Sequence, residues 1–125
     1  GLNYHESTRS FLLVESMHDI KNLIKSLNGR KKTILSYGGI GDLILTCTSE
    51  KSRNYTYGYF IGQKDYVKAN DYLKSNTVEG YYTLKAIHSL IKTKKIKMPV
   101  IDLIYKIVIN NENPDILINF LINKE

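Results

Sequence analysis

A glycine-rich loop followed at once by polar side chains is the stretch of this sequence best suited to chemistry. Three of the four residues at 38–41 are glycines, and Asp42 follows them directly. Glycine allows a backbone path that other residues rarely adopt. Asp42 stands where a helix N-cap is expected, ahead of an apolar run, and Thr46 would share a helix face with it. The pattern predicts a loop that presents a carboxylate and a hydroxyl together.

A second polar cluster, Ser52-Arg53-Asn54, follows one short turn later. The guanidinium of Arg53 can hold a phosphate or a carboxylate through two parallel hydrogen bonds. Together with the glycine loop, this cluster suits a small polar ligand. By residue type alone, however, Asp42 is more often only a helix cap, and Arg53 is more often a surface salt-bridge partner.

Both polar stretches carry a family resemblance. The sequence at 39–49 reads Gly-Ile-Gly-Asp-Leu-Ile-Leu-Thr-Cys-Thr-Ser, and Ser-Arg-Asn follows at 52–54. This resembles the signature of the C-terminal substrate domain of NAD(P)-dependent glycerol-3-phosphate dehydrogenase. The resemblance implies that Asp42 and Thr46 are catalytic residues that orient a lysine, and that Asp42 also binds substrate. In the family that lysine lies shortly upstream of the glycine matching Gly1.

The resemblance also implies which residues bind the substrate. Ser52, Arg53 and Asn54 match family positions that contact it, with Arg53 on the phosphate. The sequence departs from the family pattern directly afterwards, because Tyr55 stands where arginine or lysine is common. Tyr82 likewise replaces a frequent arginine. The change at Tyr55 removes a positive charge that the resemblance places near the anion site, and the change at Tyr82 removes a second basic group.

Contacts with the cofactor, NAD or NADP, are implied at two places. Arg53 is one of them. The other is the Val-Glu-Gly sequence at 78–80, which resembles a family turn where the residues matching Thr77 and Glu79 contact the cofactor. A purely structural interpretation is also open, in which Thr77 caps the next helix and Glu79 favours its dipole from the first turn.

The charge balance leaves another class of function open. The chain has 18 basic and 12 acidic residues, a formal net charge of +6 and a pI near 9.3. Such a balance suits nucleic acid, an acidic surface or an anionic metabolite. Basic residues at 30–32 and 92–97 make a small nucleic-acid-binding module the alternative hypothesis. No aromatic residue interleaves with the trio at 30–32, as base stacking would require.

Cysteine content, histidine spacing and the lengths of apolar runs bear on the compartment, on metal binding and on membrane insertion. A single cysteine, Cys47, excludes an internal disulfide and favours a reducing compartment. The three histidines have no second histidine or cysteine at ligand spacing, so no metal site is predicted. The sequence has neither a run of about 18 apolar residues nor a signal segment at its start. We therefore expect a cytoplasmic protein that does not enter a membrane.

Apolar residues recur at helical spacing along the chain. The first helix is predicted from a stripe formed by Leu13, Met17, Ile20, Ile24 and Leu27. We expect Ser7 or Thr8 to cap this helix, the residues at 28–29 to stop it, and the stripe to form one buried face. Further helices are predicted at 33–37, 53–62, 67–73, 80–95, 99–109 and after the Asn-Pro-Asp sequence at 113–115. The segment at 100–109 is rich in branched residues that favour strands, but its 3–4 spacing favours a helix.

The sequence thus predicts an all-α fold of one domain, residues 1–125. The resemblance implies the C-terminal helical domain of the 6-phosphogluconate-dehydrogenase-like type. No Gly-x-Gly-x-x-Gly lies on a predicted strand, so we expect the N-terminal Rossmann domain to be absent. A homodimer is compatible with the apolar stripes, and the parent's own N-terminal nucleotide-binding domain is an expected partner.

The reaction implied by the resemblance is the reduction of dihydroxyacetone phosphate to sn-glycerol 3-phosphate with NAD(P)H, which feeds phospholipid synthesis. We expect the 125-residue chain alone to be inactive, because it lacks the lysine and the nucleotide-binding domain. A related dehydrogenase that acts on another carbonyl substrate is a second alternative. The Ser52-Arg53-Asn54 cluster argues against it.

Overall fold

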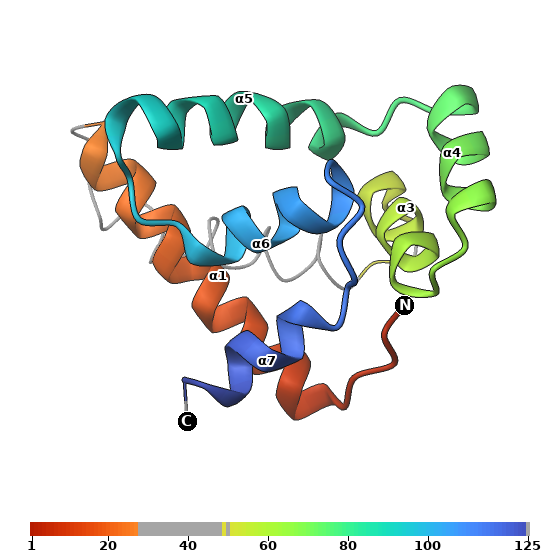
Figure 1. Ribbon diagram of the computed structural model, residues 1–125, viewed down its shortest axis with the longest axis horizontal. Coiled ribbons are helices and arrows are strands. Elements are labelled where there is room, and N and C mark those ends of the chain that lie inside the picture. The colour runs from red at the N-terminus through yellow and green to blue at the C-terminus, as the bar shows by residue number, and fades with distance from the viewer. Residues whose placement is uncertain (28–48, 50, 125) are drawn as a thin grey trace.

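The computed structural model of the protein describes residues 1–27, 49 and 51–124, which form helices joined by loops (Figure 1). In chain order the helices are α1 (Glu6–Ser26), α3 (Arg53–Gly62), α4 (Tyr66–Ser75), α5 (Glu79–Lys94), α6 (Pro99–Val108) and α7 (Ile116–Ile122). The described residues contain no strand, so the predicted all-α class is confirmed for them. The segment at 100–109 is helical as predicted, whereas the helix expected at 33–37 lies outside the described residues.

Five helix pairs make the main packing contacts. α6 lies at the centre of Figure 1 and packs against α1, α5 and α7, while α3 packs against α4 and α5. His88 of α5 stacks on Tyr105 of α6 with ring centroids 3.5 Å apart. None of the described helices is both long and apolar enough to cross a membrane.

The main core surrounds α3. Its buried side chains are those of Tyr57, Ile61, Ala69, Val78, Ile107 and Leu117. They come from α3, α4, α6, α7 and the loop before α5. Full burial of one such apolar side chain contributes about 1.5–3 kcal/mol, so this cluster fixes α3 firmly. A second cluster, formed by Ile91, Ile96 and Met98, joins the end of α5 to the start of α6.

The predicted boundaries of α1 need correction. The helix begins at Glu6, with His5 at the N-cap position and without a side-chain cap, so Ser7 and Thr8 lie inside its first turn. It ends at Ser26, and the predicted stop at 28–29 lies outside the described residues. Sequence patterns place helix ends less reliably than helix interiors, because several neighbouring residues can each serve as the first residue of a helix.

The expectation of one buried apolar face on α1 was wrong for the side chains that the structure describes. The predicted stripe is only half-buried, and Leu27 at its end is 50% exposed. The one fully buried residue of α1 is Asp19, which is 2% exposed. A carboxylate is a rare buried group and requires hydrogen-bond partners.

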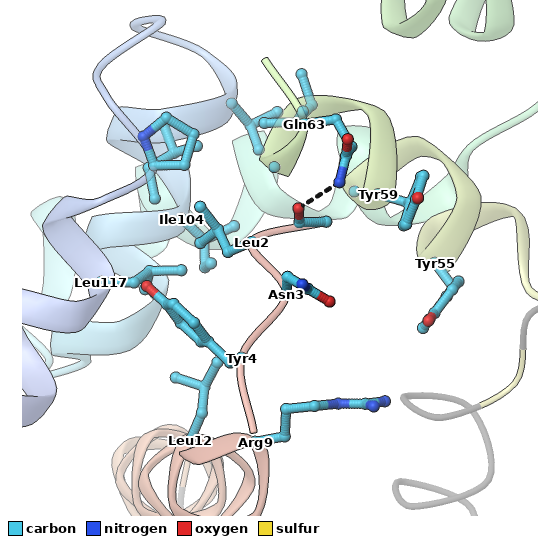
Figure 2. Close-up of a pocket in the computed structure, with 17 residues that line it drawn as sticks. Leu2, Asn3, Tyr4, Arg9, Leu12, Tyr55, Tyr59, Gln63, Ile104 and Leu117 are labelled. Carbon is cyan, nitrogen blue, oxygen red and sulfur yellow. Dashed lines mark hydrogen bonds between the residues drawn. The ribbon is translucent and has the colours of Figure 1, made fainter. Parts of the chain in front are cut away.

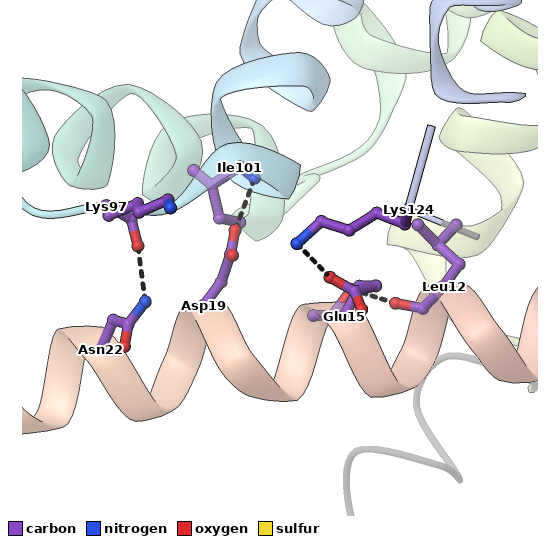
Figure 3. Close-up of polar contacts among 8 residues, drawn as sticks. Leu12, Glu15, Asp19, Asn22, Lys97, Ile101 and Lys124 are labelled. Carbon is purple, nitrogen blue, oxygen red and sulfur yellow. Dashed lines mark hydrogen bonds and ion pairs between the residues drawn. The ribbon is translucent and has the colours of Figure 1, made fainter. Parts of the chain in front are cut away.

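Asp19 obtains those partners from the start of α6 (Figure 3). Its Oδ2 accepts a hydrogen bond from the backbone N–H of Ile101 at 2.9 Å. The N-cap residue of α6 is Met98, whose side chain makes no cap hydrogen bond, and Pro99 occupies the first turn. The first N–H groups of a helix lack partners within it. Asp19 therefore caps α6 from another helix.

Two neighbours of Asp19 on the same face of α1 make further contacts with distant segments (Figure 3). The Glu15 carboxylate forms an ion pair with Lys124 at 3.5 Å, and the Asn22 amide donates to the Lys97 carbonyl oxygen at 2.8 Å. Spacings of four and three residues place all three side chains on one helix face. This polar face joins α1 to both ends of the α6–α7 segment.

Burial raises the pKa of Asp19 above the ordinary aspartate value of 3.8. Hydrogen bonds from the backbone of Ile101 and Val100 oppose this shift, while the nearby charges of Asp102 and Glu15 add to it. Desolvation dominates because the charged form loses its contact with water.

We expect Asp19→Ala to lower the free energy of unfolding by about 1–3 kcal/mol, because it leaves buried N–H groups of α6 without an acceptor. Asp19→Asn retains an acceptor oxygen and should lose much less. Denaturant titration of the three proteins at neutral pH measures the difference. Equal losses for alanine and asparagine would show that the cap does not stabilise the fold.

We also expect the stability difference between the wild type and Asp19→Asn to depend on pH. Since the pKa of Asp19 is raised in the folded state, the folded protein binds the proton more tightly than the unfolded chain. The stability of the wild type relative to Asp19→Asn should therefore rise as pH falls through the raised pKa, and level off below 3.8. Unfolding curves measured across this acidic range test the sign. A relative loss on acidification would contradict it.

Candidate functional site

The starts of α3 and α5 meet and bring four of the predicted site residues together. Arg53 and Asn54 are the first two residues of α3, and Glu79 is the first residue of α5. The Asn54 side-chain oxygen accepts a hydrogen bond from the Gly80 N–H at 3.0 Å. A longer contact of 3.5 Å joins Arg53 Nη1 to the Thr77 carbonyl oxygen. These four residues thus lie on one exposed surface.

Ser52 also lies at this junction, where it serves as the N-cap of α3. Its hydroxyl oxygen accepts a hydrogen bond from the Tyr55 N–H at 3.4 Å. This is the ordinary role of a serine at a helix start. The same cap fixes the first turn of α3, in which Arg53 lies. Binding of substrate by Ser52 remains a prediction.

The start of α5 differs from the structural interpretation of its sequence. Thr77 does not cap the helix, because the N-cap residue is Val78, which makes no side-chain cap. Val78 is instead buried in the main core and anchors the turn. The acceptor for the first turn comes from Asn54 of α3. Glu79 lies in the first turn as expected, where its charge favours the helix dipole.

Arg53 is the group best placed to bind an anion. Its side chain is exposed, and among residues 1–27, 49 and 51–124 no carboxylate lies within ion-pair distance of it. Within the described ranges, its side chain makes one contact, the long one to the Thr77 carbonyl oxygen. An arginine without a competing carboxylate keeps its paired N–H donors available for phosphate. The positive ends of the α3 and α5 dipoles add to the attraction.

Aromatic side chains pack the two helices together just behind this surface. The rings of Tyr57 and Tyr81 meet edge to face with centroids 6.0 Å apart, and burial raises the pKa of Tyr57. Tyr82 is 59% exposed beside Tyr81, at 5.4 Å between ring centroids. The ammonium of Lys85 lies 4.7 Å from the Tyr81 ring centre. Lys85 therefore places a positive charge on α5 near Tyr82, the position where the family resemblance leads one to expect an arginine.

The two predicted catalytic residues, Asp42 and Thr46, lie outside the described residues, as does Cys47. Their roles remain predictions. Within the part of the chain that the structure describes, no three His, Cys, Asp or Glu side chains gather closely enough to hold a metal ion.

A cavity of about 390 Å³ lies between the start of the chain, α3, α6 and α7 (Figure 2). Its apolar wall includes Leu2, Ile104 and Leu117. Its polar lining consists of Asn3, Tyr4, Arg9, Tyr55, Tyr59 and Gln63. None of the predicted site residues that the structure describes lines it. Of its lining residues, sequence reasoning had singled out Tyr55 as a departure from the family. A cavity formed by segments far apart in the chain leaves no local pattern to find.

Two glycines shape one wall of this cavity. A Cβ atom on Gly62 would lie 2.8 Å from the Gly1 Cα and 2.9 Å from the Leu2 nitrogen. The Gln63 amide donates to the Gly1 carbonyl oxygen at 2.7 Å (Figure 2). The start of the chain is thus held against the end of α3 by backbone contact.

The fold and the exposed arginine are those of a helical domain suited to bind an anion. Comparison with known proteins identifies the family. The family model described as the NAD-dependent glycerol-3-phosphate dehydrogenase C-terminus matches residues 1–119. The chain therefore belongs to the NAD-dependent glycerol-3-phosphate dehydrogenase family and corresponds to its C-terminal domain.

Curated relatives agree with this assignment. Glycerol-3-phosphate dehydrogenases [NAD(P)+] of Staphylococcus aureus strains USA300 and NCTC 8325 are 36% identical over 111 residues. The protein of strain JH9 is 35% identical over the same length. These alignments cover 89% of this chain and 33% of each relative. The chain thus spans about a third of the length of these relatives.

We expect Gly62→Ala to lower the free energy of unfolding by about 1–3 kcal/mol, because the new methyl group would displace the backbone of residues 1–2. Gly58→Ala is the matched control in the same helix, since a Cβ atom there meets nothing within 4 Å. It should stabilise α3 by up to about 1 kcal/mol. Thermal unfolding compares the two, and equal melting temperatures would show that the close approach is unimportant.

Proposed function

We propose that this chain is the substrate-binding domain of an enzyme that reduces dihydroxyacetone phosphate to sn-glycerol 3-phosphate with NADH or NADPH. The observation that carries the proposal is the exposed Arg53, which lies beside Asn54 and Thr77 and has no ion-pair partner among the described residues. A phosphate monoester is a ligand that such an arginine binds well. The relatives are named as glycerol-3-phosphate dehydrogenases.

Each residue at the junction has a role in this proposal. Arg53 holds the substrate phosphate, and Ser52 and Asn54 add hydrogen bonds. Arg53, Thr77 and Glu79 face the cofactor, which supplies the hydride when it is bound. These contacts orient the two ligands toward each other, so that binding energy is used to bring the reacting atoms together.

Asp42 and Thr46 complete the proposed machinery. They would orient the lysine that the family resemblance places upstream of Gly1, and Asp42 would also bind a substrate hydroxyl. Such an ammonium group must lie within about 3 Å of the substrate oxygen to deliver a proton. The proposed setting is the cytoplasm, with the product feeding phospholipid synthesis and residues 1–125 packed against a nucleotide-binding domain of the parent chain.

We expect Arg53→Ala in the parent enzyme to lower kcat/KM for dihydroxyacetone phosphate about ten- to a hundred-fold, because one charge-assisted contact contributes about 1.5–3 kcal/mol. The kcat/KM of Arg53→Lys should lie between those of the wild type and Arg53→Ala, since lysine keeps the charge but cannot form two parallel hydrogen bonds. The assay follows NADH oxidation. A folded parent that binds NADH but ignores this substrate would leave the dehydrogenase class standing and show that the substrate is another carbonyl compound.

We also expect the purified 125-residue chain alone to give no turnover of dihydroxyacetone phosphate. The proposed machinery requires a lysine and a nucleotide-binding domain that this sequence does not supply. NADH absorbance in the presence of the chain measures this, with the parent enzyme as the positive control. Turnover by the chain alone would contradict the proposed division of roles.

A further inference from the structure

The contact between Asn54 and Gly80 has a consequence for ligand binding. Asn54 Oδ1 accepts the Gly80 N–H at 3.0 Å, across 26 residues of sequence. This hydrogen bond joins the first turn of α3 to the first turn of α5. The edge-to-face contact of Tyr57 and Tyr81 continues the same junction one residue further along α5. We call the Asn54–Gly80 hydrogen bond the latch.

Gly80 is a glycine because of space and not because of backbone conformation. The described glycines include none with a positive φ, and Gly80 lies inside α5. A glycine within a helix is less favourable than alanine by about 1 kcal/mol. A Cβ atom at this position would lie 2.8 Å from Asn54 Oδ1 and 3.0 Å from Asn54 Cγ. Alanine would therefore push the asparagine amide away from the N–H group that it caps.

The latch also decides which atom of Asn54 can meet a ligand. An asparagine amide offers one acceptor oxygen and one donor nitrogen, and it can turn either toward a partner. Here the oxygen is engaged by the Gly80 N–H. The Nδ2 donor has no hydrogen-bond partner among residues 1–27, 49 and 51–124. Asn54 thus presents an unengaged donor in the same first turn of α3 as Arg53, which suits an anion and disfavours a cation.

We propose that Gly80 is a positioning residue that fixes the donor side of Asn54 toward the ligand and holds α3 and α5 in register. This inference rests on the proposed function, in which Arg53 binds the substrate phosphate and Thr77 and Glu79 face the cofactor. The latch sets the spacing between these two groups of residues. Loss of the latch weakens the binding of both ligands while the fold persists, because the main core lies behind the junction.

The first test compares Gly80→Ala with Gly58→Ala in the parent enzyme. Gly80→Ala should raise KM for dihydroxyacetone phosphate and for NADH about ten-fold each, which corresponds to about 1.4 kcal/mol. The fall in kcat should be smaller. Gly58→Ala should keep both KM values, since a Cβ atom there meets nothing within 4 Å. A folded Gly80→Ala enzyme with wild-type KM values would overturn the proposal.

A double-mutant cycle tests whether the effect passes through Asn54. Once Asn54→Ala has removed the clashing amide, adding Gly80→Ala should raise KM by no more than about two-fold further, because contacting residues act non-additively. Independent, multiplying effects of the two substitutions would show that Gly80 acts by another route and would overturn the proposal.

Asn54→Asp separates the two ends of the side chain and remains informative if Gly80→Ala fails to fold. The carboxylate keeps an acceptor for Gly80 but removes the donor and adds a negative charge beside Arg53. We expect an unchanged or higher melting temperature together with a KM for dihydroxyacetone phosphate raised more than ten-fold. An unchanged KM would refute the donor role.

Amide exchange in the 125-residue chain tests the latch without any substrate. The Gly80 N–H should be protected in the wild type and in Asn54→Asp, and should exchange at least about ten-fold faster in Asn54→Ala. Equal exchange in wild type and Asn54→Ala would overturn the latch itself. If the exchange result holds and the wild-type parent does not turn over dihydroxyacetone phosphate, the proposed substrate fails and the latch stands.

Discussion

The N–H groups at the start of a helix need acceptors, and α5 and α6 obtain them from other helices. Neither α5 nor α6 has a capping side chain of its own, since Val78 and Met98 occupy the two N-cap positions. Asn54 of α3 serves α5, and Asp19 of α1 serves α6. Each cap therefore links secondary structure to tertiary packing. A helix start that depends on a distant residue is formed only when the two helices have docked.

This arrangement explains why the candidate site lies where two helices begin. The core holds the middle of α3 through Tyr57 and Ile61, so its first turn stays at the surface with Arg53 exposed. The hydrogen bond from the Gly80 N–H to Asn54 then holds the start of α5 beside the start of α3. Two helix N-termini and one guanidinium share a small area, and their fields add. The attraction for an anion is a product of helix docking and not of one local motif.

Sequence reasoning predicted the interiors of these helices well from apolar spacing, although in α1 the apolar stripe is not the buried face. It separated helix from strand correctly in α6, where residue preference alone pointed to a strand. It failed at the ends, where Ser7 or Thr8 was expected to cap α1 and Thr77 was an open candidate to cap α5. Those expectations considered only neighbours in the chain. Asn54 and Asp19 act across 26 and 82 residues, and no local pattern reports such distances.

The same limit applies to the candidate site. The family resemblance singled out Arg53, Asn54, Thr77 and Glu79 from two separate stretches, and the structure brings these stretches into contact. The resemblance could not say that the oxygen of Asn54 is already engaged by Gly80. Residue type therefore indicates which groups can bind an anion, whereas the hydrogen bonds decide which of their atoms remain available to do so.

Asp19 and Arg53 differ in burial and in the partners that the described fold gives to their charged groups. The carboxylate is buried, accepts backbone hydrogen bonds and has a raised pKa, so its capacity is used within the protein. The guanidinium is exposed beside the latch and has no carboxylate partner among the described residues. A charged group that has no ion-pair partner within the fold is able to bind a charged ligand without first breaking an ion pair.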